Sequence, residues 1–171
     1  MNRRRRMTRV LATGGALALA LMWASPAGAG PGGGFFGPSK LSVRGAGASQ
    51  GEGGNYGLGV WASTAGTPEE ADGQFRFGHK GPDGEYGMAG NVHCLSRDAS
   101  TGLIHVSGRV FGSGGENFAG KDFFATLDVN GDPQGFSDAK IAEPDTLAPC
   151  SGNLPIVHRV TDGGYQANDG Q

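Results

Sequence analysis

The stretch GEYGMAGNVHCLSRDASTGLIHVSGRV, residues 84–110, is the most regular part of the chain. It holds two segments in which apolar residues alternate with polar or small ones, residues 85–96 and 103–111. Such alternation is typical of half-buried strands in an antiparallel sheet. We therefore predict a β-hairpin here and take it as the centre of the fold.

The alternation assigns one face of each strand to the core. The residues predicted to face it are Tyr86, Met88, Val92, Cys94, Ile104, Val106 and Val110. Directly opposed residues share a face, so the numbers of each pair must have an even sum. The hairpin loop should then contain an odd number of residues, about three or five, with Gly102 at a left-handed position.

Shorter alternating segments on both sides of the hairpin predict six further strands. These are residues 40–49, 56–64, 72–80, 121–129, 134–141 and 153–160. Turn signals separate them, Asn130-Gly131 among them, and no segment has a helical period. We predict an all-β single domain of about eight antiparallel strands. A barrel-like arrangement is favoured because successive strands are joined by short turns, and a β-sandwich is the alternative.

The N-terminus has the pattern of a secretory signal peptide. An arginine-rich start precedes an apolar run at residues 10–24 and a small-residue cleavage site, Ala27-Gly28-Ala29. This pattern predicts a signal peptide at residues 1–29 and a secreted, extracellular protein. The arginines also suggest a twin-arginine signal, but the general secretory route fits the other positions better.

The remainder of the chain divides by composition. Residues 30–39 read as a flexible Gly/Pro leader, residues 40–160 as the barrel-like domain, and residues 161–171 as a disordered polar tail. The chain is glycine-rich, with 34 glycines, which suits tight turns and close strand contacts more than helices.

The charge balance argues against nucleic acid as a partner. Removing residues 1–29 takes away five of the 14 basic residues and none of the 16 acidic ones, which leaves a net charge of −7. A nucleic-acid surface would be basic. No second long apolar run follows, so we expect no membrane association after signal cleavage.

The two cysteines, Cys94 and Cys150, are expected to pair because the chain is predicted to be exported. The bridge would close a loop of about 57 residues and stabilise the fold by roughly 4 kcal/mol. The spacing is unlike that of a redox-active C-x-x-C pair, so we predict a structural disulfide.

Two sets of residues are candidate metal ligands. His93 and His105 are predicted to lie opposite or diagonal on the outer face of the hairpin, where a third ligand would complete a divalent metal site. Solvated surface histidines are the competing interpretation, and we prefer it.

Asp128, Asn130 and Asp132 occupy the first three odd positions of a calcium loop. Pro133 replaces the required glycine, and Ala139 replaces the closing glutamate. An acidic hairpin turn is therefore the preferred interpretation of this segment.

Four aromatic residues are candidates for a ligand surface: Tyr56, Trp61, Tyr86 and Phe124. Aromatic residues in strands more often pack in the core or across strands. No nucleophile elbow or phosphate-binding loop is present in the sequence. We therefore predict no catalytic residue and no cofactor.

Several segments in order resemble a family of small, mostly uncharacterised secreted β-rich proteins of actinobacteria. The matching segments are Gly73–Phe77, Gly90–Leu95, Val106–Val110, Asp128–Asp132 and Gly152–His158. The chain departs from the family at Asn130, where the segment before the turn glycine is one residue longer. The resemblance implies an export signal and a β-rich domain, and no catalytic residues.

These observations lead to a functional hypothesis. We expect a secreted, non-enzymatic β-rich monomer with a binding or extracellular structural role, whose partner is an unknown small ligand or extracellular molecule. The alternatives are a small hydrolase or isomerase that uses the barrel interior, and a metal-binding exported protein.

Overall fold

The structure, a computed structural model, describes residues 41–146, 150 and 152–169. The predicted signal peptide and leader lie outside these residues. The described part is all-β, as predicted, with one 3₁₀ turn, η1 (Pro68–Glu70). Its strands are β1 (Leu41–Gly51), β2 (Gly54–Thr64), β3 (Ala71–Gly81), β4 (Gly84–Arg97), β5 (Ile104–Gly114), β6 (Asp122–Asp128), β7 (Gly135–Ser137), β8 (Lys140–Ala142), β9 (Ile156–Arg159) and β10 (Asp162–Asn168). Among these residues, no helix is long and apolar enough to cross a membrane.

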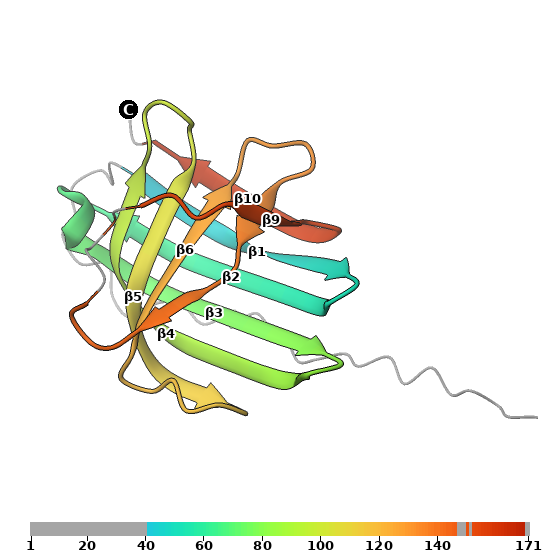
Figure 1. Cartoon of the computed structure of the whole chain (residues 1–171). Coiled ribbons are helices and arrows are strands. Elements are labelled where there is room, and N and C mark those ends of the chain that lie inside the picture. The colour runs from blue at the N-terminus through green and yellow to red at the C-terminus, as the bar shows by residue number, and fades with distance from the viewer. Residues whose placement is uncertain (1–40, 147–149, 151, 170–171) are drawn as a thin grey trace, which may run out of the picture. The chain divides into compact units, whose positions relative to one another are not determined.

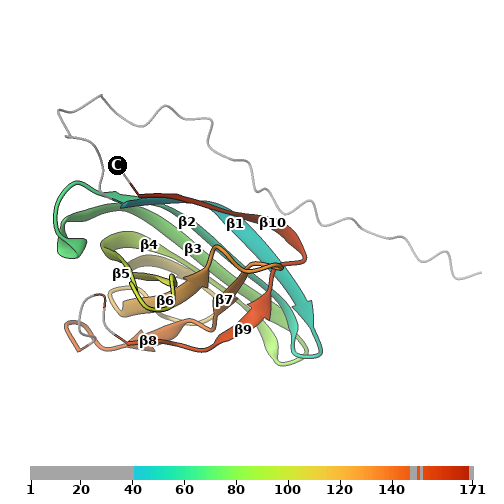
Figure 2. The same cartoon turned by 90° about the horizontal axis from the view of Figure 1, so that it is seen from above.

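All the strands belong to one antiparallel sheet with the order β10-β1-β2-β3-β4-β5-β6-β7-β9, and β8 pairs separately with β6. The sheet curls so that β5, β6 and β7 lie over the inner face of β1 to β4 (Figures 1 and 2). The result is a half-barrel, which confirms the barrel-like prediction. Short two-residue turns join β1 to β2 and β3 to β4, as the turn signals suggested.

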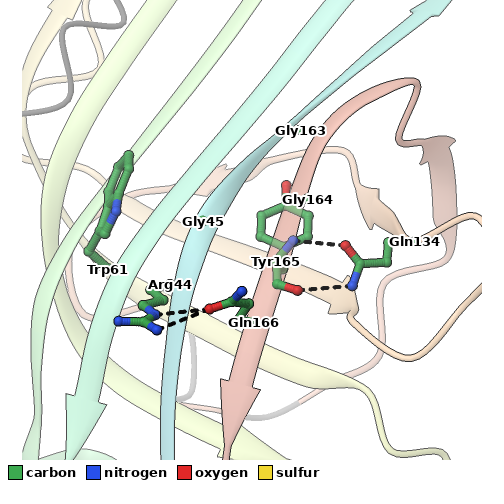
Figure 3. Close-up of a pocket in the computed structure, with 8 residues that line it drawn as sticks. All are labelled: Arg44, Gly45, Trp61, Gln134, Gly163, Gly164, Tyr165 and Gln166. Atoms are coloured by element: carbon green, nitrogen blue, oxygen red, sulfur yellow. Dashed lines mark hydrogen bonds between the residues drawn. The ribbon is translucent and has the colours of Figure 1, made fainter.

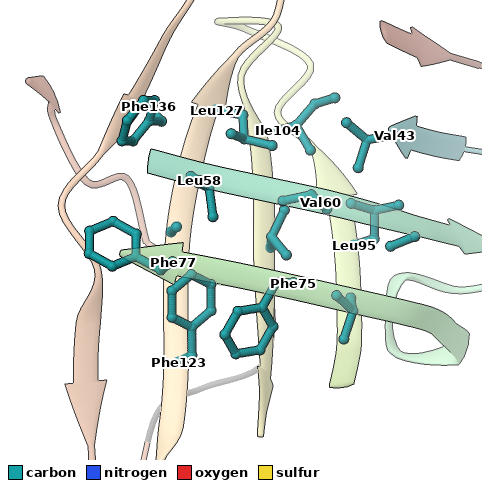
Figure 4. Packing of buried hydrophobic residues seen from close by; sticks show 14 of the residues in the cluster. Val43, Leu58, Val60, Phe75, Phe77, Leu95, Ile104, Phe123, Leu127 and Phe136 are labelled. Carbon is teal, nitrogen blue, oxygen red and sulfur yellow. The ribbon is translucent and has the colours of Figure 1, made fainter. Parts of the chain in front are cut away.

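Apolar side chains from the two layers meet inside the curl (Figure 4). The ring of Phe75 on β3 stacks on that of Phe123 on β6, with centroids 3.9 Å apart and an interplanar angle of 13°. Leu58 and Val60 on β2 and Val106 on β5 are fully buried around them. The interior is thus filled with apolar side chains, each contributing about 1.5–3 kcal/mol by leaving water.

The Gln134 side chain links β10 to the turn that precedes β7. The Gln134 Nε2 donates to the carbonyls of Val129 (2.7 Å) and Tyr165 (2.9 Å), and its Oε1 accepts from Tyr165 N (2.8 Å). The Tyr165 phenol donates to the carbonyl of Leu58 at 2.8 Å, and burial raises its pKa. Gln134 therefore acts as a short substitute for a neighbouring strand beside β10.

The loop of the central hairpin differs from the prediction. The last residue of β4, Arg97, is paired directly with the first residue of β5, Ile104, so the connecting loop has an even length. The Asp98 Oδ1 accepts from the backbone of Ser100 and of Thr101, which stabilises this longer turn. Gly102 adopts the predicted left-handed conformation, with φ of 74°.

A β-bulge at His93 explains why the hairpin loop does not have the predicted odd number of residues. The register shifts between Val92 and Cys94, so His93 is an extra residue without a partner. Val92 and Leu95 consequently both face the core, whereas Cys94 is paired with Ser107 on the outer face. The prediction that Cys94 points into the core is therefore wrong, although its side chain is buried.

The predicted disulfide between Cys94 and Cys150 is confirmed, with the two Cα atoms 5.5 Å apart. It fixes the connection between β8 and β9 to the outer face of β4. Arg109 supports the same connection, because its Nε donates to Asp122 and its Nη2 to Asp145, both at 2.7 Å. The described residues of this connection, 143–146, 150 and 152–155, contact the outer face of β5 and β6 through Asp145, Cys150 and Leu154, and we call them the strap.

Two further boundaries need correction. The predicted disordered tail contains β10, whose seven residues pair with β1 along Ser42–Ala48. The predicted strand at residues 134–141 is divided into β7 and β8, which both pair with β6. The tail was missed because Gly163 and Gly164 interrupt its alternation.

We expect Gly90→Ala to destabilise the fold by about 1–3 kcal/mol, as overpacked core substitutions do. A Cβ at Gly90 would lie 2.5 Å from Cε1 and Cζ of Phe75 and would also meet the carbonyl of Arg109. Urea unfolding followed by circular dichroism measures the effect. The matched control is Gly112→Ala, where a Cβ meets nothing within 4 Å. Equal stability of the two variants would contradict this account of the curl.

Candidate functional site

The structure divides the predicted aromatic ligand surface among three places. Trp61 lies on the outer face of β2 and is 40% exposed. Tyr56 and Tyr86 lie on the inner face of β2 and β4, at the end of the sheet closed by the β1–β2 and β3–β4 turns. Phe124 is buried on the outer face of β6. The four residues therefore form no common surface.

Tyr56 and Tyr86 belong to a ring cluster that joins the two layers of the half-barrel. Tyr56 lies between two imidazoles, with its centroid 4.4 Å from that of His79 and 4.0 Å from that of His158. Tyr86 packs against His79 at 5.2 Å and Phe118 at 5.8 Å. We call these five residues the mouth cluster.

Each histidine of the mouth cluster is held by a protein partner. His79 Nε2 lies 3.0 Å from the carbonyl of Gly53, and His158 Nε2 lies 2.6 Å from Oδ1 of Asp138. Burial, with smaller contributions from Tyr56, Asp138 and Glu116, raises the pKa of Tyr86. The cluster thus gathers several titratable groups, but their rings pack on one another.

A second arrangement lies on the outer face of β10, β1 and β2 (Figure 3). Arg44 on β1 is paired directly with Trp61 on one side and with Gln166 of β10 on the other. The Arg44 guanidinium donates to the Gln166 Oε1 from Nε at 3.2 Å and from Nη2 at 3.1 Å. These hydrogen bonds hold the guanidinium beside the indole.

These three residues border an open pocket of about 500 Å³. Its remaining lining residues are Gly45, Gln134, Gly163, Gly164 and Tyr165. The anchored amide of Gln134 requires glycine at one of these positions, because a Cβ at Gly164 would lie 2.8 Å from its Oε1. Backbone, amide and guanidinium groups thus surround one exposed aromatic ring, a composition common in ligand sites.

Small residues make room for the Trp61 indole on the outer face of the sheet. A Cβ at Gly59 would lie 2.8 Å from Cη2 and 2.9 Å from Cζ3 of the indole, and 3.6 Å from Cβ of Ala46. The six-membered ring of the indole therefore lies next to Gly59, and the exposed part of the side chain is turned to solvent. A ring fixed in this way presents a preformed stacking surface.

The structure places the predicted metal ligands His93 and His105 in different surroundings. His93 is exposed at the bulge, whereas His105 is paired with Ser96 and is buried beneath the strap. Three residues separate their positions along β4, about 10 Å of strand, so the predicted opposite or diagonal register is wrong. No cluster of three or more His, Cys, Asp or Glu side chains suited to a metal occurs among the described residues. The metal site itself stays a prediction, without a third ligand in this part of the chain.

His105 makes protein contacts on the outer face. Its Nδ1 lies 3.4 Å from Oγ1 of Thr126, which accepts from the backbone N of Leu154 in the strap at 3.2 Å. Its ring stacks on Phe124 at 6.1 Å. Burial lowers the pKa of His105 below its ordinary value, and the charge of Asp98 opposes this shift weakly.

The predicted calcium ligands lie in a turn that uses its own carboxylate. Asp128 Oδ1 accepts from the backbone N of Gly131 at 2.8 Å, and its Oδ2 lies 3.5 Å from Nη1 of Arg159. Asn130 and Asp132 are exposed beyond it. This geometry agrees with the acidic hairpin turn, and calcium binding stays a prediction.

Several residues of both arrangements were not predicted from the sequence. Arg44 and Gln166 join Trp61 only through strand pairing, and β10 was not predicted. His79 and His158 are separated by most of the domain in sequence and meet through Tyr56. The alternation of β3 did place His79 on the same face as Phe75 and Phe77, which was the available signal.

Comparison with known proteins identified no relative: no family model, curated protein or solved structure matches this chain. The resemblance to the actinobacterial secreted family therefore stays a prediction.

We expect acid to destabilise the protein through His105. Because the folded state lowers the pKa of this imidazole, the unfolded chain binds more protons near and below the ordinary value of 6.5. Stability therefore falls as the pH decreases from about 6.5 toward the folded-state pKa. Urea unfolding between pH 7.5 and about 5 should show a smaller slope for His105→Gln than for the wild type. The control His93→Gln, at an exposed position, should keep the wild-type slope, and an unchanged slope in His105→Gln would refute the assignment.

Proposed function

We propose that this protein is a secreted, non-enzymatic domain that binds an extracellular ligand through the outer face of β10, β1 and β2. The Cys94–Cys150 disulfide supports export, because such bonds persist in oxidising compartments. The apolar filling of the half-barrel supports a surface-binding role. Interior positions such as Leu58, Val60 and Phe75 are fully buried apolar residues, so polar groups that could bind a ligand lie on the outer surface.

The observation that carries the proposal is the exposed Trp61 beside the Arg44–Gln166 pair. Tryptophan and arginine are enriched where proteins bind partners, because each offers a large rigid contact and specific hydrogen bonds. Here both are preorganised, since the indole rests on Gly59 and the guanidinium is held by Gln166. Preorganisation lowers the entropic cost of binding.

The mouth cluster favours one alternative, a small hydrolase or isomerase. The His158–Asp138 contact of 2.6 Å orients an imidazole as a general base requires, and Tyr56 and His79 lie next to it. The filled interior argues against a substrate site behind these rings. The outer-face binding site is therefore the preferred function.

Native mass spectrometry of the protein, purified from the medium of cells that export it, tests this proposal. We expect a bound mass on the wild type that is reduced at least about tenfold in occupancy by Trp61→Ala, which removes the stacking surface. Phe111→Ala, at another exposed aromatic residue, is the matched control and should keep the bound mass.

Two results would decide against the outer face. A bound mass that survives Trp61→Ala but is lost in Tyr56→Ala would place the ligand at the mouth cluster and favour the enzyme. A wild-type protein without a bound mass, even when concentrated medium is added back, would contradict a binding role.

A further inference from the structure

We propose that the outer face binds an acidic polysaccharide, which lies across the strands with a sugar ring on Trp61 and its carboxylates on Arg44 and Arg76. This inference rests on the binding function proposed above and names the class of ligand.

The row crosses five neighbouring strands at one level, and all its side chains are exposed. Strand pairing places its members side by side in the order Gln166, Arg44, Trp61, Gln74 and Asn91. Neighbouring strands are ~4.8 Å apart, so the row is about 19 Å long. A pyranose ring has nearly the length of one strand spacing, so an extended polysaccharide can present about one sugar per strand.

The side chains of this outer row suit sugars more than apolar ligands. Amide and guanidinium groups exchange hydrogen bonds with hydroxyls in fixed planes. The C–H bonds on one side of a pyranose ring are weakly positive and pack on the negative face of an indole. The Trp61 ring lies next to Gly59 and is 40% exposed, so part of it is open to such stacking.

The next row beside the indole provides room and a second cation. Gly59 is paired with Ala46 on β1 and with Arg76 on β3, and Arg76 is paired with Ala89. The indole occupies the space next to Gly59, whereas the short side chains of Ala46 and Ala89 let a bound polymer approach the backbone beside it. Arg76 is the long side chain among them and is exposed.

Charge selects an acidic polymer over a neutral one. Within the described part of the chain, neither Arg44 nor Arg76 has a carboxylate at ion-pair distance, whereas Arg97 and Arg159 each have one and Arg109 has two. Two unpaired guanidinium groups on a chain with excess acid favour carboxylate ligands, which guanidinium binds in bidentate geometry.

One carboxylate, Asp72, lies close to the outer row: it is paired with Ser63 and lies on the opposite side of Gln74 from Arg76. Of the other acidic residues, Glu85 forms an ion pair with Lys80, and Asp162 begins β10. The guanidinium groups of Arg44 and Arg76 outnumber the Asp72 carboxylate beside Trp61, and salt should weaken binding to them.

Affinity electrophoresis of the full chain in native gels tests the proposal with two acidic probes, polygalacturonate and hyaluronate. We expect retardation by at least one of them. For polygalacturonate, the fully methyl-esterified polymer is the matched neutral probe, and affinity should fall at least about tenfold on esterification because the guanidinium groups lose their carboxylate partners.

Variants assign the binding to the outer row. Trp61→Ala should weaken it at least about tenfold, and Arg44→Gln or Arg76→Gln about three- to tenfold each, with a reduced dependence on salt. Lys140→Gln is the matched control, since Lys140 is an exposed cation of β8 outside this face. Thermal unfolding of each variant separates lost binding from lost folding.

The outcomes distinguish the ligand class from the binding function. If the acidic and esterified polymers retain the protein equally, and this retention still depends on Trp61, the ligand is not specifically acidic. The proposed binding site on the outer face would still stand. Retention that is unchanged in Trp61→Ala, Arg44→Gln and Arg76→Gln would overturn the site itself. Retention by neither probe would overturn the polysaccharide proposal, whereas the bound mass in native mass spectrometry tests the binding function independently.

Discussion

The stacked rings of Phe75 and Phe123 hold the two layers of the curled sheet together. Their contact requires the backbone of β4 to approach closely, which the absence of a side chain at Gly90 permits. Once the layers are fixed, the alternation of every strand assigns its residues to the filled interior or to the outside. The mouth cluster lies on one side of this division and the outer row around Trp61 on the other. Both candidate sites therefore depend on the same packed core.

Strand alternation predicted the fold class and the inner-face residues other than Cys94, because these depend on periodicity. The disulfide was predicted from residue type, as two cysteines in a chain expected to be exported. The bulge at His93 was not predictable in the same way. One extra residue moves Cys94 to the outer face, but no residue type in the sequence signals it. The prediction of an odd-length hairpin loop was therefore wrong. The last strand was missed for a related reason. Gly163 and Gly164 make the segment look like a tail, yet glycine is what lets β10 lie against the amide of Gln134.

Sequence reasoning identified Trp61 as a ligand candidate but grouped it with aromatic residues that the fold separates. Arg44 and Gln166 provide the polar groups beside Trp61. Strand register brings them together, although they are far apart in the sequence. Register depends on turn lengths and bulges, which are the least visible features of a sequence. The same limit applies to His79 and His158, which meet at Tyr56 because the sheet curls.

The pairing of β1 with β10 has a consequence for the order in which the domain can form. The first strand of the sheet is synthesised long before the strand that covers its edge. Until β10 has been made, the edge of β1 is open and its backbone groups are free to pair with another chain. The alternating glycines and alanines of β1 give that edge few apolar side chains, so a nascent chain would offer a poor template for aggregation. The small residues that form the surface beside Trp61 in the folded protein would thus also limit aggregation of the incomplete chain during synthesis.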